Sequence, residues 1–429
     1  MATETRNATL APAANAPRGA RLLPPRALPS LAAHIEWYGD APVTDAGVWS
    51  DVERSGLRGK GGARFPTVTK LTAVAARRRR AIVVANGAEG EPASQKDTVL
   101  MTHVPHLLLD GAELAAELVG AREVILCVKR GSVAMPFLER ALAERRKYRY
   151  ERVPIRVVGA PTRYVSGEET ALVNWLNGGD AKPTFVPPRP FERGVAGRPT
   201  LVQNIETLCD LALIGRFGAA WFRSAGTRDD PGTTLVTLSG AVERPGVYEI
   251  PLGVRLGEVV RIGGPPANGL AGILVGGYFG AWLPADSSAD VAMAVEPMRR
   301  AGSGLGAGVV FAMPREGTCA LAEIARTTRW LADENAGQCG PCVNGLDSIA
   351  GAMAVLVAGD RNGRAQAHLE RWLSMMEGRG ACKHPDGVSR FVGSSLSVFS
   401  DEIERHRRVG PCRIGDRGLL PTRQTGSWR

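Results

Sequence analysis

Three short apolar segments, with helical segments between them, constrain the fold of this chain more than any other feature. They are AIVVANG (residues 81–87), EVILCVK (123–129) and PIRVVGA (154–160). Each has the length and the β-branched content of a buried strand. The stretches HLLLDGAELAAELVG and AMPFLERALAERRK between them repeat apolar residues at helical spacing. The alternation predicts a parallel sheet with right-handed crossovers, and therefore an α/β fold.

The pattern of predicted secondary structure changes twice beyond this region. A proline-rich connector, KPTFVPPRPFERGVAGRP, precedes a helix expected from about Asn204. From Thr233 onward, TTLVTLSGAV, GVYEI and GILVGGYFGAWLP predict short strands, with a short helix around RLGEVVRIGG, and together they indicate a small β-rich module. Beyond Cys319 the pattern is almost wholly helical, which predicts a terminal helical bundle.

Composition and charge indicate a globular protein and argue against nucleic-acid-binding, membrane-spanning and secreted proteins. The 429 residues, 44% hydrophobic and 22% charged, are typical of a globular protein of two to four domains. The net charge of +10 comes from scattered basic residues with one compact run at 77–80, so we expect no nucleic-acid binding. The weakly polar run at 348–359 is shorter than the roughly 18 residues that cross a bilayer. The N-terminus lacks the apolar core of a secretory signal.

The cysteines indicate a reducing compartment. Seven of them, an odd number over a long chain, do not suggest a disulfide framework, so we expect a cytoplasmic protein. Cys127 and Cys209 lie in apolar patterns and are expected to be core thiols. Cys339-Gly-Pro-Cys342 has a spacing shared by thioredoxin-like dithiols and by halves of metal sites. Because it lies between two helices rather than after a strand, a cluster or metal site completed by distant thiols is favoured.

Three polar or glycine-rich stretches carry candidate ligand-binding chemistry. GLRGKGGARFPT (56–67) can bring backbone N–H groups close to a phosphate or ring, although a plain surface turn explains it equally well. VVANGAEGEPASQKD (83–97) follows a strand to the sheet edge where α/β folds bind ligands, so Asn86, Glu89 and Glu91 are candidate acceptors and Lys96 a candidate phosphate partner. In YVSGEETALVNWLNGG (164–179), Ser166 and Glu169 form a capping-box pattern, whereas Tyr164 and Glu168 need another explanation.

These stretches, together with GRPTLVQNIETL, occur in an order that resembles the NADH-binding flavoprotein subunit of respiratory complex I and the related diaphorase subunits of hydrogenases and formate dehydrogenases. The resemblance covers about residues 50–400. It implies an FMN/nicotinamide-binding α/β domain (31–225), a β-grasp domain (230–300) and a helical iron–sulfur domain (310–408). The residues outside these domains, 1–30 and 409–429, are expected from their own sequence to be disordered tails.

The resemblance also implies the site residues. FMN contacts are expected from Gly59, Lys60, Gly61, Lys70, Asn86, Glu89, Tyr164, Glu168 and Asn204. Phe65, Glu91 and Glu169 are expected around the nicotinamide nucleotide, NADH or NADPH. Cys339, Cys342 and Cys382 are the expected ligands of an iron–sulfur cluster of the [4Fe–4S] type.

The sequence departs from the family at several of these positions. Ala336 replaces the first cluster cysteine, so the cluster is expected to be incomplete, absent, or completed by a ligand from elsewhere. Cys319 is disfavoured as that ligand, because the helix between it and Ala336 would carry it some 25 Å away. Ala88 and Gln203 replace an aspartate and an asparagine near FMN, and Ala73 and Arg189 replace aromatic residues that grip the adenine. Arg64 replaces a glycine, and with Arg189 it suggests a loosened choice between NADH and NADPH.

The expected function is that of an electron-transfer flavoprotein subunit, an NAD(P)H dehydrogenase of the diaphorase type. It would oxidise NAD(P)H through FMN and pass electrons through the iron–sulfur centre to a ferredoxin-like or quinone-linked redox partner, with membrane contact only through that partner. Electron flow in the opposite direction is compatible with the same residues. The alternative is a non-catalytic ligand-binding or scaffolding relative that has lost the cluster.

Overall fold

The predicted strands form a four-stranded parallel sheet with the order β4-β3-β2-β5. The computed structural model describes residues 8–9, 21–77, 79–423 and 426–429. The strands are β1 (Ala8–Thr9), β2 (Ala81–Gly87), β3 (Ala121–Lys129), β4 (Ile155–Ala160), β5 (Thr200–Asn204), β6 (Thr233–Gly240), β7 (Gly246–Pro251), β8 (Leu270–Val275), β9 (Ala281–Leu283) and β10 (Val309–Pro314).

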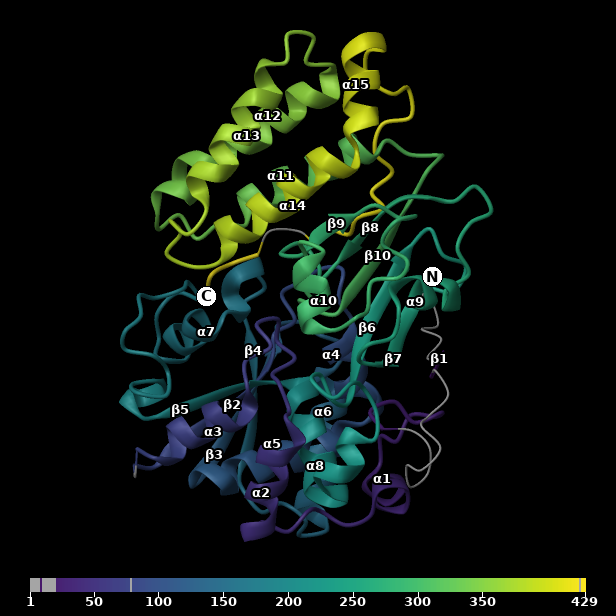
Figure 1. Cartoon of the computed structure of the whole chain (residues 1–429). Helices are drawn as coiled ribbons and strands as arrows, with labels where there is room; N and C mark the ends of the chain where they lie inside the picture. The colour runs from purple at the N-terminus through teal and green to yellow at the C-terminus, as the bar shows by residue number, and fades with distance from the viewer. Residues whose placement is uncertain (1–7, 10–20, 78, 424–425) are drawn as a thin grey trace.

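Helices surround both sheets and form the C-terminal region (Figure 1). They are α1 (Leu31–Tyr38), α2 (Ala46–Ser55), α3 (Thr67–Ala75), α4 (Lys96–His103), α5 (Pro105–Val119), α6 (Met135–Lys147), α7 (Glu169–Leu176), α8 (Ile205–Arg223), α9 (Leu256–Ile262), α10 (Val295–Arg300), α11 (Ala320–Asp333), α12 (Leu346–Ala358), α13 (Arg364–Met376), α14 (His384–Val398) and α15 (Ser400–Val409). Shorter helical turns are η1 (Tyr164–Gly167), η2 (Val195–Gly197) and η3 (Pro341–Gly345).

The parallel sheet is buried on both faces, as its nearly continuous apolar strands require. Val83, Ala85 and Leu126 face a large core shared with α5 and α8. Ile82 and Val84 face a smaller core that Leu172 and Val173 of α7 help to close. The sequence did not anticipate β5, which pairs in parallel with β2 so that Asn86 lies opposite Asn204. This register brings two predicted site residues to the same edge of the sheet.

The β-rich module is a mixed six-stranded sheet with the order β1-β7-β6-β10-β8-β9. It extends beyond the expected boundary at residue 300, because β10 pairs with both β6 and β8 in its centre. The stretch GILVGGYFGAWLP, expected as one strand, is an antiparallel pair, β8 and β9. The chain turns at Gly276 and Gly277, whose φ angles of 96° and 86° favour glycine.

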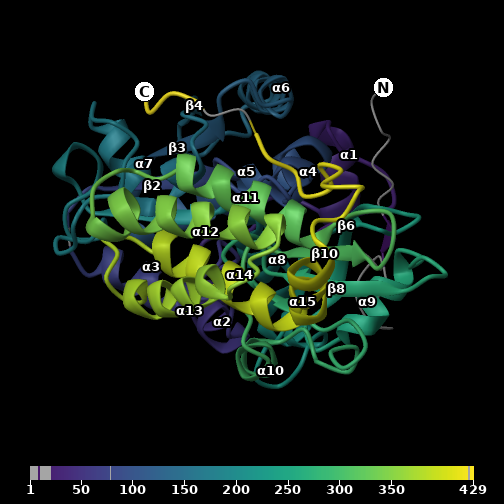
Figure 2. The ribbon, with the colours of Figure 1, turned by 90° about the horizontal axis from the view of Figure 1, so that it is seen from above.

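The helices α11 to α15 form the expected C-terminal bundle and lie over the carboxyl edge of the parallel sheet (Figures 1 and 2). One helical stretch, Pro341–Ala358, is apolar and long enough to span a membrane by length and composition alone. Its residues Leu346, Ile349 and Met353 are buried in the bundle core. A core helix of a bundle meets the same criteria.

Both terminal segments differ from the expected disorder where the structure describes them. Residues 1–7 and 10–20 of the first tail lie outside the described part of the chain. Leu22, Leu23 and Leu28, by contrast, are buried in the main core, because three leucines in ten residues offer enough apolar surface to hold that segment. At the other end, residues 410–423 run as an extended segment from α15 toward the parallel sheet, and Leu420 is fully buried. We call residues 410–423 the C-terminal strap.

Candidate cofactor site at the sheet edge

The predicted site residues gather where β2, β4 and β5 end. The loop 88–95 follows β2, η1 and the start of α7 follow β4, and α8 begins directly after β5. In parallel α/β sheets this carboxyl edge is where ligands bind. The structure therefore brings together the polar loop, the capping-box segment and the stretch GRPTLVQNIETL (197–208), which we call the PT motif, although the three span about 120 residues of sequence.

The glycine-rich stretch lies against the start of α8. The N–H of Lys60 donates to Oγ1 of Thr207 at 2.8 Å, and the N–H of Gly59 donates to the carbonyl of Phe65 at 2.8 Å. A Cβ on Gly61 would lie 3.3 Å from Cβ of Asn204, so Gly59, Gly61 and Asn204 share one small region. Gly62 has a φ of 114° and open space where a side chain would be. A backbone loop of this shape lets a flat or phosphorylated ligand approach closely.

The side chain of Lys60 points away from this loop. Its ammonium group is buried, donates to the carbonyl of Thr233 at 2.7 Å and lies 3.9 Å from Asp210. Burial lowers the pKa of Lys60 to about 8 and raises the pKa of the Asp210 carboxyl to about 7. The expected FMN contact from Lys60 is thus restricted to its main chain, because its charge belongs to the junction with the β-rich module.

The ammonium group of Lys96 is likewise buried and bound by other protein groups. Its Nζ lies 2.7 Å from Asp97, 3.0 Å from Glu206 and 3.2 Å from Oδ1 of Asn204. Burial opposes the charge on Lys96, but the adjacent Asp97 and Glu206 carboxylates outweigh it and raise the pKa of the ammonium group. The phosphate role considered for Lys96 is not supported by this placement. Asn204 also donates to Asp97 at 2.7 Å and caps α8.

Two of the predicted carboxylates serve as helix caps. Glu89 accepts from the N–H groups of Asp97 and Thr98 at 2.9 and 3.0 Å, at the start of α4. Glu168 accepts from the N–H groups of Thr170 and Ala171 at 2.9 and 3.1 Å, at the start of α7. Glu168, which the capping-box pattern left unexplained, is therefore the N-cap of α7. The sequence assigned the capping role to Ser166, which instead donates to Pro161 and Arg163 carbonyls.

Asn86 ties the two loops together. Its Nδ2 donates to the carbonyl of Gly167 at 2.8 Å, while its Oδ1 accepts from the N–H of Ala88 at 3.2 Å. The polar loop after β2 and the turn η1 after β4 are thus held at a fixed separation, and the predicted residues Asn86 and Glu168 lie on either side of Gly167.

Glu91 and Tyr164 form a buried pair beneath the helical bundle. The hydroxyl of Tyr164 donates to Oε2 of Glu91 at 3.0 Å, and the N–H of Tyr278 donates to the same oxygen at 2.8 Å. Burial raises the pKa of the Glu91 carboxyl, and these hydrogen bonds oppose that rise. Tyr278 comes from the turn between β8 and β9, so sequence reasoning had no signal that would place it here.

Lys70 and Glu169 form the half-exposed part of the site. Nζ of Lys70 lies 2.8 Å from Oε2 of Glu169 and donates to the carbonyl of Val202 at 3.3 Å. Phe65 is 47% exposed, which is unusual for a phenylalanine and leaves its ring available to a partner. All three side chains are therefore at least partly exposed and accessible to a ligand.

The two arginines that suggested a loosened nicotinamide preference lie in different settings. Arg64 is 7% exposed, donates to Oγ1 of Thr234 at 3.1 Å and faces the buried Glu206 and Asp210 carboxylates. It points into the junction with the β-rich module, which contradicts a role beside an adenosine phosphate. Arg189 is exposed in the connector, where its N–H donates to Glu192 at 2.8 Å.

Orphaned polar atoms show that the site suits a polar ligand. Nε2 of Gln203 and Oγ1 of Thr67 are buried and have no hydrogen-bond partner among the described residues. Buried polar groups without partners are uncommon in folded proteins and mark places where another molecule supplies the missing bond. Gln203 directly precedes Asn204, which lies against Gly61, and Thr67 is the last residue of the glycine-rich stretch. The residues present therefore fit a flavin nucleotide at this edge.

The three predicted cluster cysteines come together in the bundle. Cys339 lies just before the turn η3, Cys342 lies within it, and Cys382 precedes α14. Burial raises the pKa of the Cys342 thiol, and the neighbouring Cys339 and Cys382 thiols raise it further. Mutually close cysteine sulfurs are the donor set of an iron–sulfur cluster, so the residues fit that group. Ala336 is buried beside them and offers no ligand.

The cysteines also lie close to the sheet-edge site. Burial raises the pKa of the Cys382 thiol, and among the charges that add to this rise is the Glu168 carboxylate. Glu334, at the end of α11, accepts from the N–H of Tyr164 at 2.8 Å and pairs with Arg163 at 3.2 Å. The bundle is therefore joined to η1 by direct polar contacts.

The C-terminal strap reaches the same loop, a contact that no sequence signal predicted. Arg423 donates to the carbonyl of Glu89 at 2.9 Å. The Trp330 ring nitrogen donates to the carbonyl of Arg423 at 2.7 Å, and the Tyr278 hydroxyl donates to the carbonyl of Pro421 at 2.5 Å. The strap thus joins α11, the β8–β9 turn and the polar loop after β2.

Comparison with known proteins gives consistent matches over the chain. Residues 52–213 match the family model described as the Nuo51 FMN-binding domain, and residues 322–406 match the NADH-ubiquinone oxidoreductase-F iron-sulfur binding region. The second F-type subunit of the NADH-quinone oxidoreductase of Rhizobium meliloti (strain 1021) is 32% identical over 378 residues, covering 84% of this chain and 89% of the relative. The F-type subunit of the NADH-quinone oxidoreductase of Mycobacterium bovis is 34% identical over 408 residues, covering 87% of each chain.

A solved structure shares the fold. The crystal structure of an NAD⁺-reducing [NiFe]-hydrogenase in the air-oxidized state contains a chain that superimposes with a TM-score of 0.78 at 32% sequence identity. The match covers 89% of this chain and 64% of the hydrogenase chain, so the present chain spans under two thirds of that neighbour's length.

Proposed function

Since this chain belongs to the family of the F-type subunits of NADH-quinone oxidoreductase, we propose that it is the flavoprotein subunit through which NADH delivers electrons to a larger redox assembly. The observation that carries the proposal is the convergence of the family's polar loop, capping-box segment and PT motif at one sheet edge, directly beneath the bundle that holds three cluster cysteines. It is an NADH dehydrogenase of the diaphorase type with FMN and an iron–sulfur centre as cofactors.

FMN, when bound, accepts a hydride from a nicotinamide and releases the two electrons singly. We place it between the glycine-rich stretch and the Asn86–Gly167 contact, where the backbone at Gly61 and Gly62 and the free polar atoms of Gln203 and Thr67 offer hydrogen bonds. Lys70 is a partly exposed cation beside the glycine-rich stretch and is assigned to the flavin phosphate. Asn86, Glu89, Glu168 and Asn204 act mainly by fixing the loops that surround the flavin.

The nicotinamide nucleotide is assigned to the exposed side of the same edge. Phe65 and Glu169 are accessible there, whereas Glu91 lies deeper and is held by Tyr164 and Tyr278. No acid or base need take part in the hydride step, so these groups orient the ring and exclude water rather than transfer protons. With Arg64 buried, Arg189 is the one of these two arginines that is exposed and free to meet an adenosine phosphate.

The iron–sulfur centre is assigned to Cys339, Cys342 and Cys382. Four thiolates are usual for a cubane cluster, and Ala336 removes one of them. We propose that water, a small thiol or a partner residue completes the centre. Cys319 is not a candidate, because α11 separates it from Ala336 by about 21 Å at the helical rise per residue.

The partner and the compartment are proposed from the relatives and from the cysteine chemistry. The relatives are named as subunits of an NADH-quinone oxidoreductase, and the structural neighbour is part of a hydrogenase, so we expect a ferredoxin-like or quinone-linked redox partner that provides any contact with a membrane. A cytoplasmic location is proposed because an odd number of cysteines over a long chain does not suggest a disulfide framework.

A reduction experiment tests the proposal. Full-length protein purified anaerobically and supplied with FMN should be yellow, and its flavin absorbance should bleach with NADH under argon. Single-turnover reduction by NADH and NADPH then compares the two donors. Protein that stays colourless after FMN addition would contradict the enzyme and favour a scaffolding relative.

A further inference from the structure

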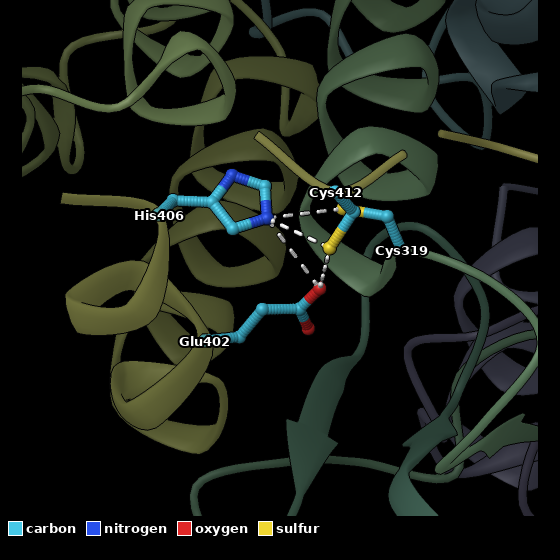
Figure 3. A group of neighbouring side chains, drawn as sticks. All are labelled: Cys319, Glu402, His406 and Cys412. Carbon is cyan, nitrogen blue, oxygen red and sulfur yellow. Dashed lines mark hydrogen bonds and ion pairs between the residues drawn. The ribbon is translucent and has the colours of Figure 1, made fainter. Parts of the chain in front are cut away.

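A second cluster of metal-ligating side chains lies at the opposite end of α11 from the iron–sulfur cysteines. Cys319 is the N-cap of α11, Glu402 and His406 are four residues apart on one face of α15, and Cys412 follows in the strap. One sulfur, nitrogen or oxygen from each residue lies within 4.8 Å of all the others (Figure 3). Cys319 and His406 are buried, and the other two are partly buried.

The separations lie close to those between ligand atoms around a single tetrahedral ion. Nε2 of His406 lies 3.5 Å from Sγ of Cys319, 3.1 Å from Sγ of Cys412 and 3.9 Å from Oε1 of Glu402. Sγ of Cys412 lies 3.8 Å from the same oxygen. Zinc bonds of about 2.3 Å to sulfur and about 2.0 to 2.2 Å to nitrogen and oxygen place tetrahedral ligand atoms roughly 3.3 to 3.8 Å apart.

The surroundings prepare these atoms to bind a cation. Nδ1 of His406 lies 2.8 Å from the carbonyl of Val357 in α12. Because a carbonyl can only accept, Nδ1 carries the hydrogen, and the lone pair of Nε2 faces the sulfurs. Arg405 donates to Sγ of Cys412 at 2.8 Å, and the N–H of Ala322 donates to Sγ of Cys319 at 3.4 Å.

We propose that Cys319, Glu402, His406 and Cys412 bind one Zn²⁺ ion, in a site distinct from the iron–sulfur centre. Two thiolates, an imidazole and a carboxylate form a closed donor set of the kind found in structural zinc sites, and zinc favours such borderline-soft ligands. The proposal concerns the same bundle as the proposed function, but its readouts require neither FMN nor NADH.

The ion would anchor the C-terminal strap. Beyond Cys412, the carbonyl of Gly415 accepts from the N–H of Cys319 at 2.9 Å, and the buried Glu323 accepts from the N–H groups of Arg417 and Leu419 at 2.5 and 3.0 Å. The strap ends with Arg423 on the polar loop of the cofactor site. A zinc ion bound by Cys412 therefore fixes the start of the C-terminal strap, and Arg423 at the other end of the strap holds the polar loop.

Metal analysis of the full chain tests the site. We expect about one zinc per chain after anaerobic purification and zinc reconstitution, and a loss of about fivefold or more in Cys412→Ser and in His406→Gln. Cys382→Ser is the matched control, because it removes a thiol from the other cysteine group and should lower iron while leaving zinc unchanged. Cobalt substitution should give the intense visible bands of a tetrahedral thiolate site, and these should vanish in His406→Gln.

Several results would overturn the proposal. The first is that the wild-type protein takes up no zinc, and the second is that Cys382→Ser loses its zinc. The third is that iron remains bound in Cys382→Ser but is lost in Cys412→Ser, which would make iron the metal of this site. The fourth is a disulfide between Cys319 and Cys412 in protein kept anaerobic. Hydrogen exchange in the wild-type chain tests separately whether the zinc ion anchors the C-terminal strap. Chelation should accelerate hydrogen exchange at the amides of Arg417 and Leu419, and unchanged exchange after zinc removal would refute that role.

Discussion

The hydroxyl of Tyr164 donates to Oε2 of Glu91 at 3.0 Å, joining the turn after β4 to the loop after β2 at the base of the cofactor site. The ring of Tyr164 packs edge-on against Phe279 and Trp330, so the hydroxyl is held in place by aromatic contacts from two other regions of the chain. This hydrogen bond therefore links the charge of the Glu91 carboxyl to the packing of the Tyr164 ring against Trp330 of the bundle.

Tyr164→Phe should leave the fold intact, since the ring keeps its contacts, but should raise the pKa of Glu91 by removing a hydrogen bond that opposes the effect of burial. The acid limb of the pH profile for flavin reduction by NADH should therefore move to higher pH. Tyr278→Phe is the control, because its hydroxyl donates to Pro421 and not to Glu91. Identical pH profiles for wild type and Tyr164→Phe would contradict this assignment.

Lys70→Met should weaken FMN binding by about 1 to 2 kcal/mol, because a half-exposed ammonium group contributes a charge-assisted but partly screened contact to a phosphate. Fluorescence titration of the apoprotein measures the affinity. Lys147→Met, at the exposed end of α6, should have no effect. An FMN affinity equal to wild type in Lys70→Met would place the phosphate elsewhere.

Ala336→Cys should restore a fourth thiolate beside Cys339, Cys342 and Cys382. We expect a higher iron and sulfide content per chain and slower loss of the cluster in air, since an open coordination position is the point of attack by solvent and oxygen. Anaerobic iron and sulfide analysis of the two proteins measures this. If neither has iron, the helical domain has become purely structural.

Arg423→Ala should lower FMN affinity modestly, by about 1 kcal/mol, because the polar loop loses the guanidinium that holds the Glu89 carbonyl. Fluorescence titration of the apoprotein with FMN measures this affinity. Arg413→Ala, an exposed residue of the same strap, is the matched control. Equal losses in both variants would show that the strap does not act through this contact.

His106 should make the fold sensitive to acid. Burial and the adjacent Arg145 lower the pKa of the His106 imidazole to about 3. The unfolded chain binds a proton to this residue near pH 6.5 and the folded chain does not, so the free energy of unfolding falls as the pH drops from about 6.5 to 3, by up to about 1.4 kcal/mol per pH unit. Thermal unfolding of wild type and His106→Gln over this range should show a shallower slope for the variant, and parallel slopes would rule His106 out.

The order of elements and motifs was available from the sequence because it depends on local patterns. Apolar segments at 81–87, 123–129 and 154–160 became β2, β3 and β4, and the helical periodicity beyond Cys319 became the bundle. Loop positions at the ends of parallel strands follow from the fold class alone. That is why the loop carrying Asn86 and Glu91 was expected at the sheet edge, whereas Tyr164 and Glu168 were expected beside it only from the resemblance of the motifs to a known family.

What only the tertiary structure decided is how each charged side chain is used. A lysine in a glycine-rich stretch looks the same in sequence whether its ammonium group faces a ligand or buried protein groups. For Lys60 those groups are Asp210 in α8 and the carbonyl of Thr233 in the β-rich module, about 150 and 170 residues later in the chain. The strap was unpredictable for the same reason, since its contacts with Glu323 and Glu89 involve no local periodicity. Cys319, Glu402, His406 and Cys412 likewise form one donor set only because the bundle folds α11 and α15 together. Local sequence fixes backbone preferences and periodicity, whereas long-range electrostatic pairing is set by which distant groups share a low-dielectric interior.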